Sequence, residues 1–105
     1  MRRMLRQYAA QSLLLDASQA ETFILDLQTS VQKLQLKNIS PGQLYVFVLR
    51  QDETGNHRLN WGTQAVNAMM LDPNPLSVTV QCFIGTAGGT LFAVPPGTWT
   101  EEEGT

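Results

Sequence analysis

The sequence predicts an all-β domain, an antiparallel β-sandwich or jelly-roll-like barrel of six to eight strands. Two observations carry this prediction: apolar and polar residues alternate over short segments, and turn residues separate these segments every eight to twelve residues or so. A chain of 105 residues suits one such unit. We expect an N-terminal arm over residues 1–20, the β-sandwich over residues 21–99 and an acidic tail over residues 100–105.

The first 20 residues mix apolar side chains with arginine and glutamine. Met4, Leu5 and Tyr8 have helical spacing, but no cap or proline marks a helix start. An extended arm that adds a strand to a neighbouring subunit would use the same residues. We therefore expect an extended or partly helical arm outside the β-body. Its expected partner contacts are Arg2, Arg3, Arg6, Tyr8, Leu13 and Leu14.

Three strands are predicted in the first half of the body. Residues 23–27 alternate, with Phe23, Leu25 and Leu27 on one face, and residues 31–39 alternate again. Ser40-Pro41-Gly42 is a turn by composition. The following residues 44–49 are apolar on both faces, so this strand should lie in the middle of a sheet and be covered on both sides.

Two hairpins are predicted in the second half. The loop 52–56 should return residues 57–61 against the central strand, with Gly55 in a left-handed conformation. Residues 65–71 suit a strand or an irregular crossing, and the two prolines of residues 72–75 end the sheet. Val78, Val80, Cys82 and Ile84 then share one face of a strand, and a glycine turn leads back through residues 90–94.

Composition favours a protein that contacts other proteins. Charged residues make up only 15% of the chain, and amide and hydroxyl side chains replace them. The net charge of -2 combines arginines at the start with Glu101, Glu102 and Glu103 near the end. Because the arginines form the only basic cluster, nucleic-acid binding is not expected.

Metal, redox and membrane roles are not expected either. The single cysteine, Cys82, cannot form an intrachain disulfide, and one cysteine with one histidine is too few for a Cys/His metal cluster. We predict no metal and no cofactor. Gln7, Gln11 and Asp16 interrupt the apolar stretch that would make a signal sequence, and no apolar run is long enough to span a membrane.

The sequence contains no recognised catalytic motif, and no enzyme activity is predicted. His57 could act as a general base oriented by Asp52 or Glu53, but an exposed hairpin flank explains it more simply. Asp26 and Asp72 could pair as glycosidase carboxylates, although Asp72 suits a turn cap. We assign no catalytic residue.

Four aromatic residues could form a platform that stacks against sugar rings, although packing in the core is the commoner role for such residues. These are Tyr45, Phe47, Trp61 and Trp99.

Residues 39–61 contain a distinctive order of short motifs. A Gly42-Gln43 turn leads into an apolar strand, which is followed by Gln51-Asp52, Thr54-Gly55, Arg58 and Trp61. This order resembles a module recurrent in bacteriophage structural proteins and tail fibres, and the likeness continues more loosely over about residues 22–94. The module usually has proline after the tryptophan, where this chain has Gly62, and residues 1–20 have no counterpart.

The resemblance implies a virion protein with a β-sandwich body, often trimeric and without enzymatic activity. A single module with its own arm suits a capsid decoration, or cement, protein that binds the major capsid protein and bridges neighbouring subunits. The alternative is a tail fibre or tail adaptor module that binds a receptor glycan or other tail proteins. In either case the protein would be made in the host cytoplasm and located in the virion, with no membrane partner.

Overall fold

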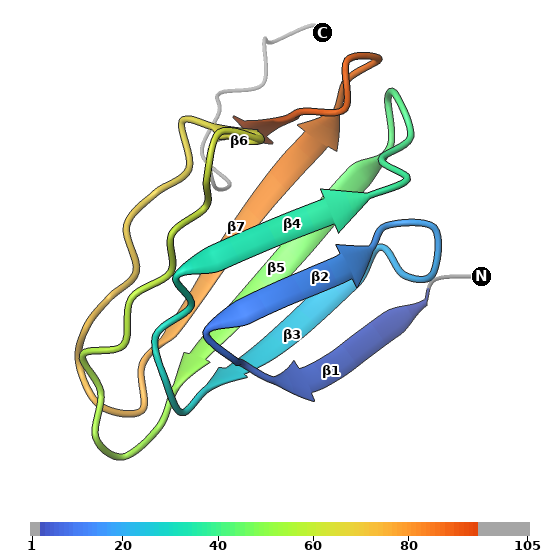
Figure 1. Ribbon diagram of the computed structural model, residues 1–105. Helices are drawn as coiled ribbons and strands as arrows, with labels where there is room; N and C mark the ends of the chain where they lie inside the picture. Colours follow the sequence, from blue (N-terminus) through green and yellow to red (C-terminus); the bar gives the residue numbers. More distant parts are fainter. Residues whose placement is uncertain (1–2, 95–105) are drawn as a thin grey trace, which may run out of the picture.

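Eight β-strands form two layers in the computed structural model, which describes residues 3–94 (Figure 1). The larger sheet has the strand order β1-β3-β5-β7-β8-β6, and β2 and β4 form the smaller sheet. The strands are β1 (Met4–Tyr8), β2 (Ser12–Asp16), β3 (Thr22–Leu27), β4 (Lys33–Lys37), β5 (Leu44–Gln51), β6 (Ala65–Val66), β7 (Val78–Gly85) and β8 (Leu91–Val94). The described residues include no helix, so the all-β prediction is confirmed.

The first five strands wind back and forth between the two layers (Figure 1). Because consecutive strands lie in different sheets, each strand pairs in parallel with the strand two places along the chain. The register aligns Leu5, Phe23 and Phe47 across β1, β3 and β5. The prediction of a purely antiparallel arrangement was therefore wrong for this half of the chain.

The second half is a true hairpin. β8 is antiparallel to β7, as the sequence predicted. β7 is also antiparallel to β5, a pairing that the sequence analysis did not predict. At the turn, the Thr86 N–H donates to the Thr90 carbonyl at 2.9 Å, and the two threonine hydroxyls lie 2.6 Å apart. The short β6 completes this edge by pairing in parallel with β8.

The core lies between the layers and follows the alternation of the strands. Phe23, Phe47 and Phe83 come from three adjacent strands and are fully buried. The Phe47 ring stacks on Phe23 at a centroid distance of 5.2 Å and meets Phe83 edge to face at 5.6 Å. Trp61 completes the cluster, 5.0 Å from Phe83 and 5.4 Å from Phe47. Such edge-to-face aromatic contacts add to the free energy gained from burial alone.

The two strands β2 and β4 do not cover the whole inner face of the larger sheet. The irregular segment between β5 and β7 packs on the rest through Leu59, Trp61, Ala65, Ala68 and Leu71. Because this segment has few strand partners of its own, its backbone groups need other hydrogen bonds.

Three glutamine side chains make hydrogen bonds between this segment and the two sheets: Gln51 and Gln81 reach it from the larger sheet, and Gln64 belongs to the segment and reaches β4. Gln51 and Gln81 are buried, and Gln64 is half-buried. The Gln81 carboxamide accepts from the Met69 N–H at 3.0 Å, and Gln64 pairs with both backbone groups of Leu36 at 3.0 and 2.9 Å. Amide side chains thus replace a missing strand in three places.

The structure corrects two further predictions about the chain path. The segment expected to be an arm outside the body contributes β1 and β2, and Leu13 and Leu15 of β2 are buried in the core. Residues 57–61 do not form a hairpin with β5; they cross to the other layer, where Leu59 bridges Val31 in parallel.

Candidate interaction surface

The outer face of the larger sheet carries a broad group of apolar side chains, which we call the apolar patch. Their strands are β5, β7 and β8, and the alternate residues of these strands point away from the core. Several are substantially exposed, including Leu44 at 56%, Val80 at 46% and Phe92 at 48%. The members of the patch are Leu44, Val46, Val48, Val78, Val80, Cys82, Ile84, Phe92 and Val94.

Strand register makes this patch continuous. Val48 lies opposite Val80, and Leu44, Ile84 and Phe92 form one row across three strands. A second row joins Val46, Cys82 and Val94. None of the nine side chains is charged, so the patch is uniformly apolar across its rows. Contiguous apolar surface of this kind is characteristic of protein contact sites.

Alternation in β7 was predicted correctly, but not which face meets the core. Val78, Val80, Cys82 and Ile84 share one face, and that face points outward. Gln81 and Phe83 occupy the inner face instead and are buried. The more apolar face of this strand therefore points away from the protein's own core.

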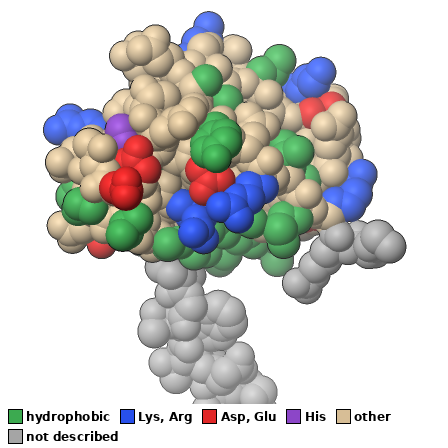
Figure 2. All heavy atoms as spheres, turned by 90° about the horizontal axis from the view of Figure 1, so that it is seen from below, with side chains coloured by type: hydrophobic (Ala, Val, Ile, Leu, Met, Phe, Trp, Pro, Cys, Tyr) green, Lys and Arg blue, Asp and Glu red, His purple; other side chains and the backbone are tan. Residues whose placement is uncertain are grey.

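A charged cluster borders the apolar patch where β1, β3 and β5 end. The Arg6 guanidinium binds both Asp26 carboxylate oxygens, at 2.8 and 3.1 Å, and Arg50 Nε lies 3.4 Å from Asp26 Oδ1. The Arg6 hydrogen bond lowers the pKa of Asp26 below its ordinary value, despite partial desolvation. Tyr8 lies beside the cluster and is 68% exposed. In the view from below, basic side chains lie next to an acidic one near the centre of the face (Figure 2).

The remaining residues expected in the arm have separate roles. Arg3 forms an ion pair with Glu21, and its N–H donates to the same carboxylate at 2.8 Å. Leu13 is a core residue, whereas Leu14 is 60% exposed. The structure thus places Arg6 and Tyr8 on the outer face of the larger sheet but does not bring Leu13 or Leu14 there. Arg2 lies outside the described residues.

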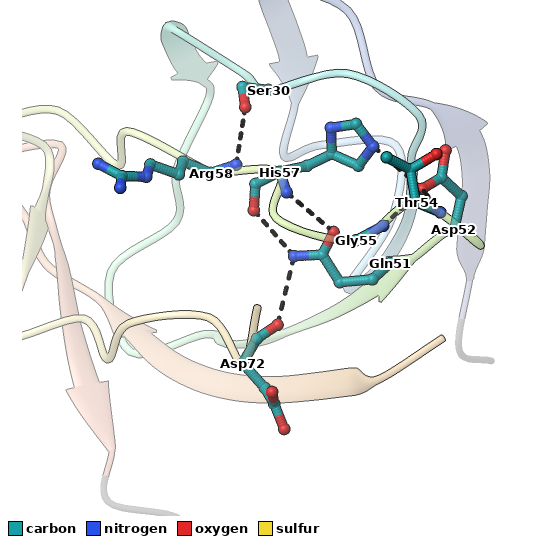
Figure 3. A network of polar contacts seen from close by, with 8 residues as sticks. All are labelled: Ser30, Gln51, Asp52, Thr54, Gly55, His57, Arg58 and Asp72. Carbon is teal, nitrogen blue, oxygen red and sulfur yellow. Dashed lines mark hydrogen bonds and ion pairs between the residues drawn. The ribbon is translucent and has the colours of Figure 1, made fainter. Parts of the chain in front are cut away.

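The motif residues of the loop after β5 form a closed hydrogen-bond network (Figure 3). Asp52 Oδ1 accepts from the Thr54 and Gly55 N–H groups at 3.0 and 3.1 Å and lies 3.0 Å from His57 Nε2. Desolvation raises the pKa of Asp52, but the Gly55 N–H and the His57 ring outweigh it and hold that pKa below its ordinary value.

Gln51 completes this network through its side chain. Its carboxamide accepts from the His57 N–H at 3.2 Å and donates to the His57 carbonyl at 2.8 Å (Figure 3). It also donates to the Asp72 carbonyl at 3.3 Å. Gln51, Asp52, Thr54 and Gly55 therefore hold the loop in shape, and the His57–Asp52 contact belongs to that scaffold.

The other motif residues also have local roles. Gly42 has a positive φ of 79°, and its N–H donates to the Gly85 carbonyl at 2.9 Å. The Gln43 carbonyl accepts from the Gly85 N–H at the same distance. Arg58 is exposed, and its backbone N–H donates to Ser30 Oγ at 2.8 Å.

The aromatic platform and the carboxylate pair are not assembled. Tyr45 and Phe47 are fully buried, and Trp61 packs on the core with its Nε1 buried and without a hydrogen-bond partner among the described residues. Trp99 lies outside the described residues. Asp26 belongs to the arginine cluster, whereas Asp72 caps its own turn by accepting from the Asn74 N–H at 3.0 Å.

Residues 3–94 contain no group of three metal-ligating side chains close enough to hold an ion. The same residues include no helix long and apolar enough to cross a membrane.

Sequence reasoning missed the apolar patch as a surface. The available signal was the strand 44–49, which is apolar on both faces and was expected to be covered on both sides. The structure confirms that β5 is central and covers its inner face, whereas none of residues 3–94 covers its outer face. No family model, no curated protein and no solved structure matches this chain.

Proposed function

We propose that this chain is a structural protein of a bacteriophage virion, a capsid decoration protein that stabilises the capsid by bridging neighbouring subunits. The layered body serves as a β-sandwich scaffold that presents one sheet face to protein partners. Binding is the whole activity in this proposal, and no reaction is catalysed.

The orientation of β7 is the observation that carries the proposal. In a soluble protein, a strand with one buried face normally turns its apolar residues toward the core of that protein. Here Val78, Val80 and Ile84 point outward while Gln81 is buried. A partner that covers the apolar patch would remove that exposed apolar surface from water and stabilise the assembly.

The virion assignment rests on the resemblance of residues 39–61 to phage structural modules. That resemblance implies the major capsid protein as the partner and a homotrimeric decoration unit. The paucity of charged residues, 15% of the chain, also suits a protein with extensive protein contacts.

The test is quantitative mass spectrometry of purified virions of the phage that encodes the chain. A copy number close to that of the major capsid protein supports the decoration role. Complete absence from the particles, with the protein present in the lysate, contradicts it.

A matched pair of variants tests whether the patch contributes. Val80→Lys places a charge within the apolar patch, and Leu14→Lys places one at a comparably exposed residue of the smaller sheet. We expect the first variant to lower virion occupancy and the second to preserve it. Equal virion occupancy of the two variants would show that the apolar patch does not contribute to virion binding.

The second candidate is a tail fibre or adaptor module that binds a receptor glycan. A pocket of about 490 Å³ favours it, because polar and apolar side chains meet there. The pocket is lined by Asn56, His57, Arg58, Leu59, Met70, Leu71 and Pro73. A copy number close to that of other tail components, together with glycan-array binding that Arg58→Ala abolishes, would support this candidate over the first.

A further inference from the structure

We propose that the C-terminal segment of this chain, residues 95–105, covers the apolar patch in the free protein. Trp99 would pack on the patch, and Glu101, Glu102 and Glu103 would meet the charged cluster at its border. The inference rests on the proposed function for the role of the patch and adds its regulation, since a virion partner would bind by displacing this segment. The segment itself lies outside the described residues.

The described part of the chain ends on the patch. Val94 is its last residue and belongs to the row that Val46 and Cys82 form. The next two residues, Pro95 and Pro96, have no N–H to donate to a neighbouring strand, so the sequence disfavours a longer β8. The segment therefore starts from the surface that it is proposed to cover.

The direction and length of the chain allow contact with the centre of the patch. β8 is antiparallel to β7, so it leads from the level of Cys82 toward the level of Val80 and Val48. With about 3.3 Å per residue and about 4.8 Å between strands, Val48 lies about 12 Å from Val94. Trp99, five residues beyond Val94, can span about 16 Å when extended.

An indole ring suits the patch chemically. The patch residues carry no charge, and Val80 is 46% exposed. Tryptophan gains more than most side chains from burial on such a surface, because it removes a large apolar area from water. Cover by this ring would also give β5 the second covered face that its sequence requires.

The charges at the border complement the acidic end of the segment. Arg50 is about half exposed and makes one contact with Asp26 at 3.4 Å, whereas Arg6 binds both oxygens of that carboxylate. Two arginines and one aspartate leave an excess positive charge in this cluster. By the same strand spacings Arg50 lies about 16 Å from Val94, and Glu101, seven residues beyond Val94, can span about 23 Å.

The covalent link favours this segment over a separate molecule in dilute solution. A segment tethered within reach of its site has an effective concentration in about the millimolar range. A second copy of the chain or another protein at micromolar concentration must compete with it.

The first experiment is NMR spectroscopy of the purified full chain. Nuclear Overhauser effects should connect the Trp99 indole protons with the methyl groups of Val48 or Val80. A mixture of isotope-labelled and unlabelled chains separates contacts within one chain from contacts between copies. If these contacts are missing, or arise only between copies, the inference is overturned.

Cys82 provides a second measurement, because it is the chain's only cysteine and belongs to the patch. Trp99→Ala should raise the rate at which Cys82 reacts with a maleimide at least about threefold, since a thiol reacts in proportion to its exposed population. Leu14→Ala, at an exposed residue of the smaller sheet, should leave this rate unchanged. An unchanged rate in Trp99→Ala contradicts the inference.

Arg50→Gln tests the charge contact. It should also raise the Cys82 rate at low salt, whereas Lys33→Gln, at an exposed residue of β4, should not. In the Trp99→Ala background Arg50→Gln should add nothing, because the two side chains hold the same segment. A full additional increase there would mean that Arg50 acts on the thiol without the segment.

Virion occupancy distinguishes this inference from the proposed function. Missing contacts of Trp99 in a chain that still decorates virions would overturn the inference alone. A covered patch in a chain that is absent from virions would contradict the proposed function and leave the contact of the segment in place.

Discussion

The carboxamide of Gln64 pairs with both backbone groups of Leu36 as a strand would. The Leu36 N–H donates to Gln64 Oε1 at 3.0 Å, and Gln64 Nε2 donates to the Leu36 carbonyl at 2.9 Å. Leu36 belongs to β4, whose edge toward residue 64 has no neighbouring strand in the described part of the chain. One side chain therefore closes the edge of the smaller sheet.

Gln64→Ala should lower the free energy of unfolding by about 1–3 kcal/mol, because it leaves two part-buried backbone groups without partners. Urea denaturation measures this change. Amide hydrogen exchange should show faster exchange at Leu36 and unchanged protection at Val48 in the centre of the larger sheet. Equal acceleration at both amides would contradict a local role for Gln64.

Gly55 and Gly42 form a matched pair for testing backbone strain. Both have positive φ, 71° and 79°, but a Cβ at Gly55 would lie 2.8 Å from the Pro73 carbonyl oxygen, whereas nothing lies within 4 Å at Gly42. Gly42→Ala should cost about 1–2 kcal/mol from the left-handed backbone alone. Gly55→Ala should cost about 2–5 kcal/mol, because overpacking is added. Thermal unfolding compares the two, and similar losses would refute the contact with Pro73.

Asp16 should contribute to stability in a pH-dependent way. Its carboxylate accepts from Ser18 Oγ at 2.6 Å, Asn38 Nδ2 at 3.0 Å and the Ser18 N–H at 2.9 Å. These bonds lower its pKa from 3.8 to about 2. Since the folded pKa lies below the unfolded one, the contribution is complete above about pH 4 and is lost as the pH falls toward 2.

Asp16→Ala should therefore unfold at a lower temperature than the wild type at pH 6, with the difference shrinking between pH 4 and pH 2. Thermal melts of both proteins across this range give the measurement. A carbon-13 titration of the Asp16 carboxyl group provides the control. A difference in melting temperature that stays constant down to pH 2 would contradict the assignment.

The two arginines beside Asp26 should affect its titration unequally. Arg6 makes two bonds to the carboxylate, at 2.8 and 3.1 Å, whereas Arg50 makes one contact at 3.4 Å. Arg6→Gln should raise the pKa of Asp26 more than Arg50→Gln does, as measured by NMR titration. If the pKa of Asp26 rose as much or more in Arg50→Gln, the two bonds from Arg6 would not be the main reason why this pKa is low.

Local features of the fold were predictable from sequence because they depend on nearby residues. Alternation located β3, β4 and β5, and the glycine turn located the β7–β8 hairpin. The cap at Asp72 was also predictable, since an Asx turn needs only an N–H two residues ahead. The loop residues Gln51, Asp52 and Gly55 were singled out by a motif, although their role in bracing the loop was not.

Which strands pair with one another, and which face of each strand meets the core, could not be predicted in the same way. The same alternation is compatible with parallel or antiparallel neighbours, so the winding of β1 to β5 between layers could not be deduced from it. Leu13 looked like an arm contact because nothing local shows that β2 pairs with β4.

The sequence by itself determined that this chain is all-β, where most strands lie and that β5 needs cover on both faces. Only the tertiary structure decided which face of β7 meets the core, and it chose Gln81 and Phe83 over the valines. The physical reason is that the contacts of the inner face are non-local: Phe83 packs edge to face on Phe47, and Gln81 accepts from the Met69 N–H at 3.0 Å. The valines are thereby left outside, available to a partner.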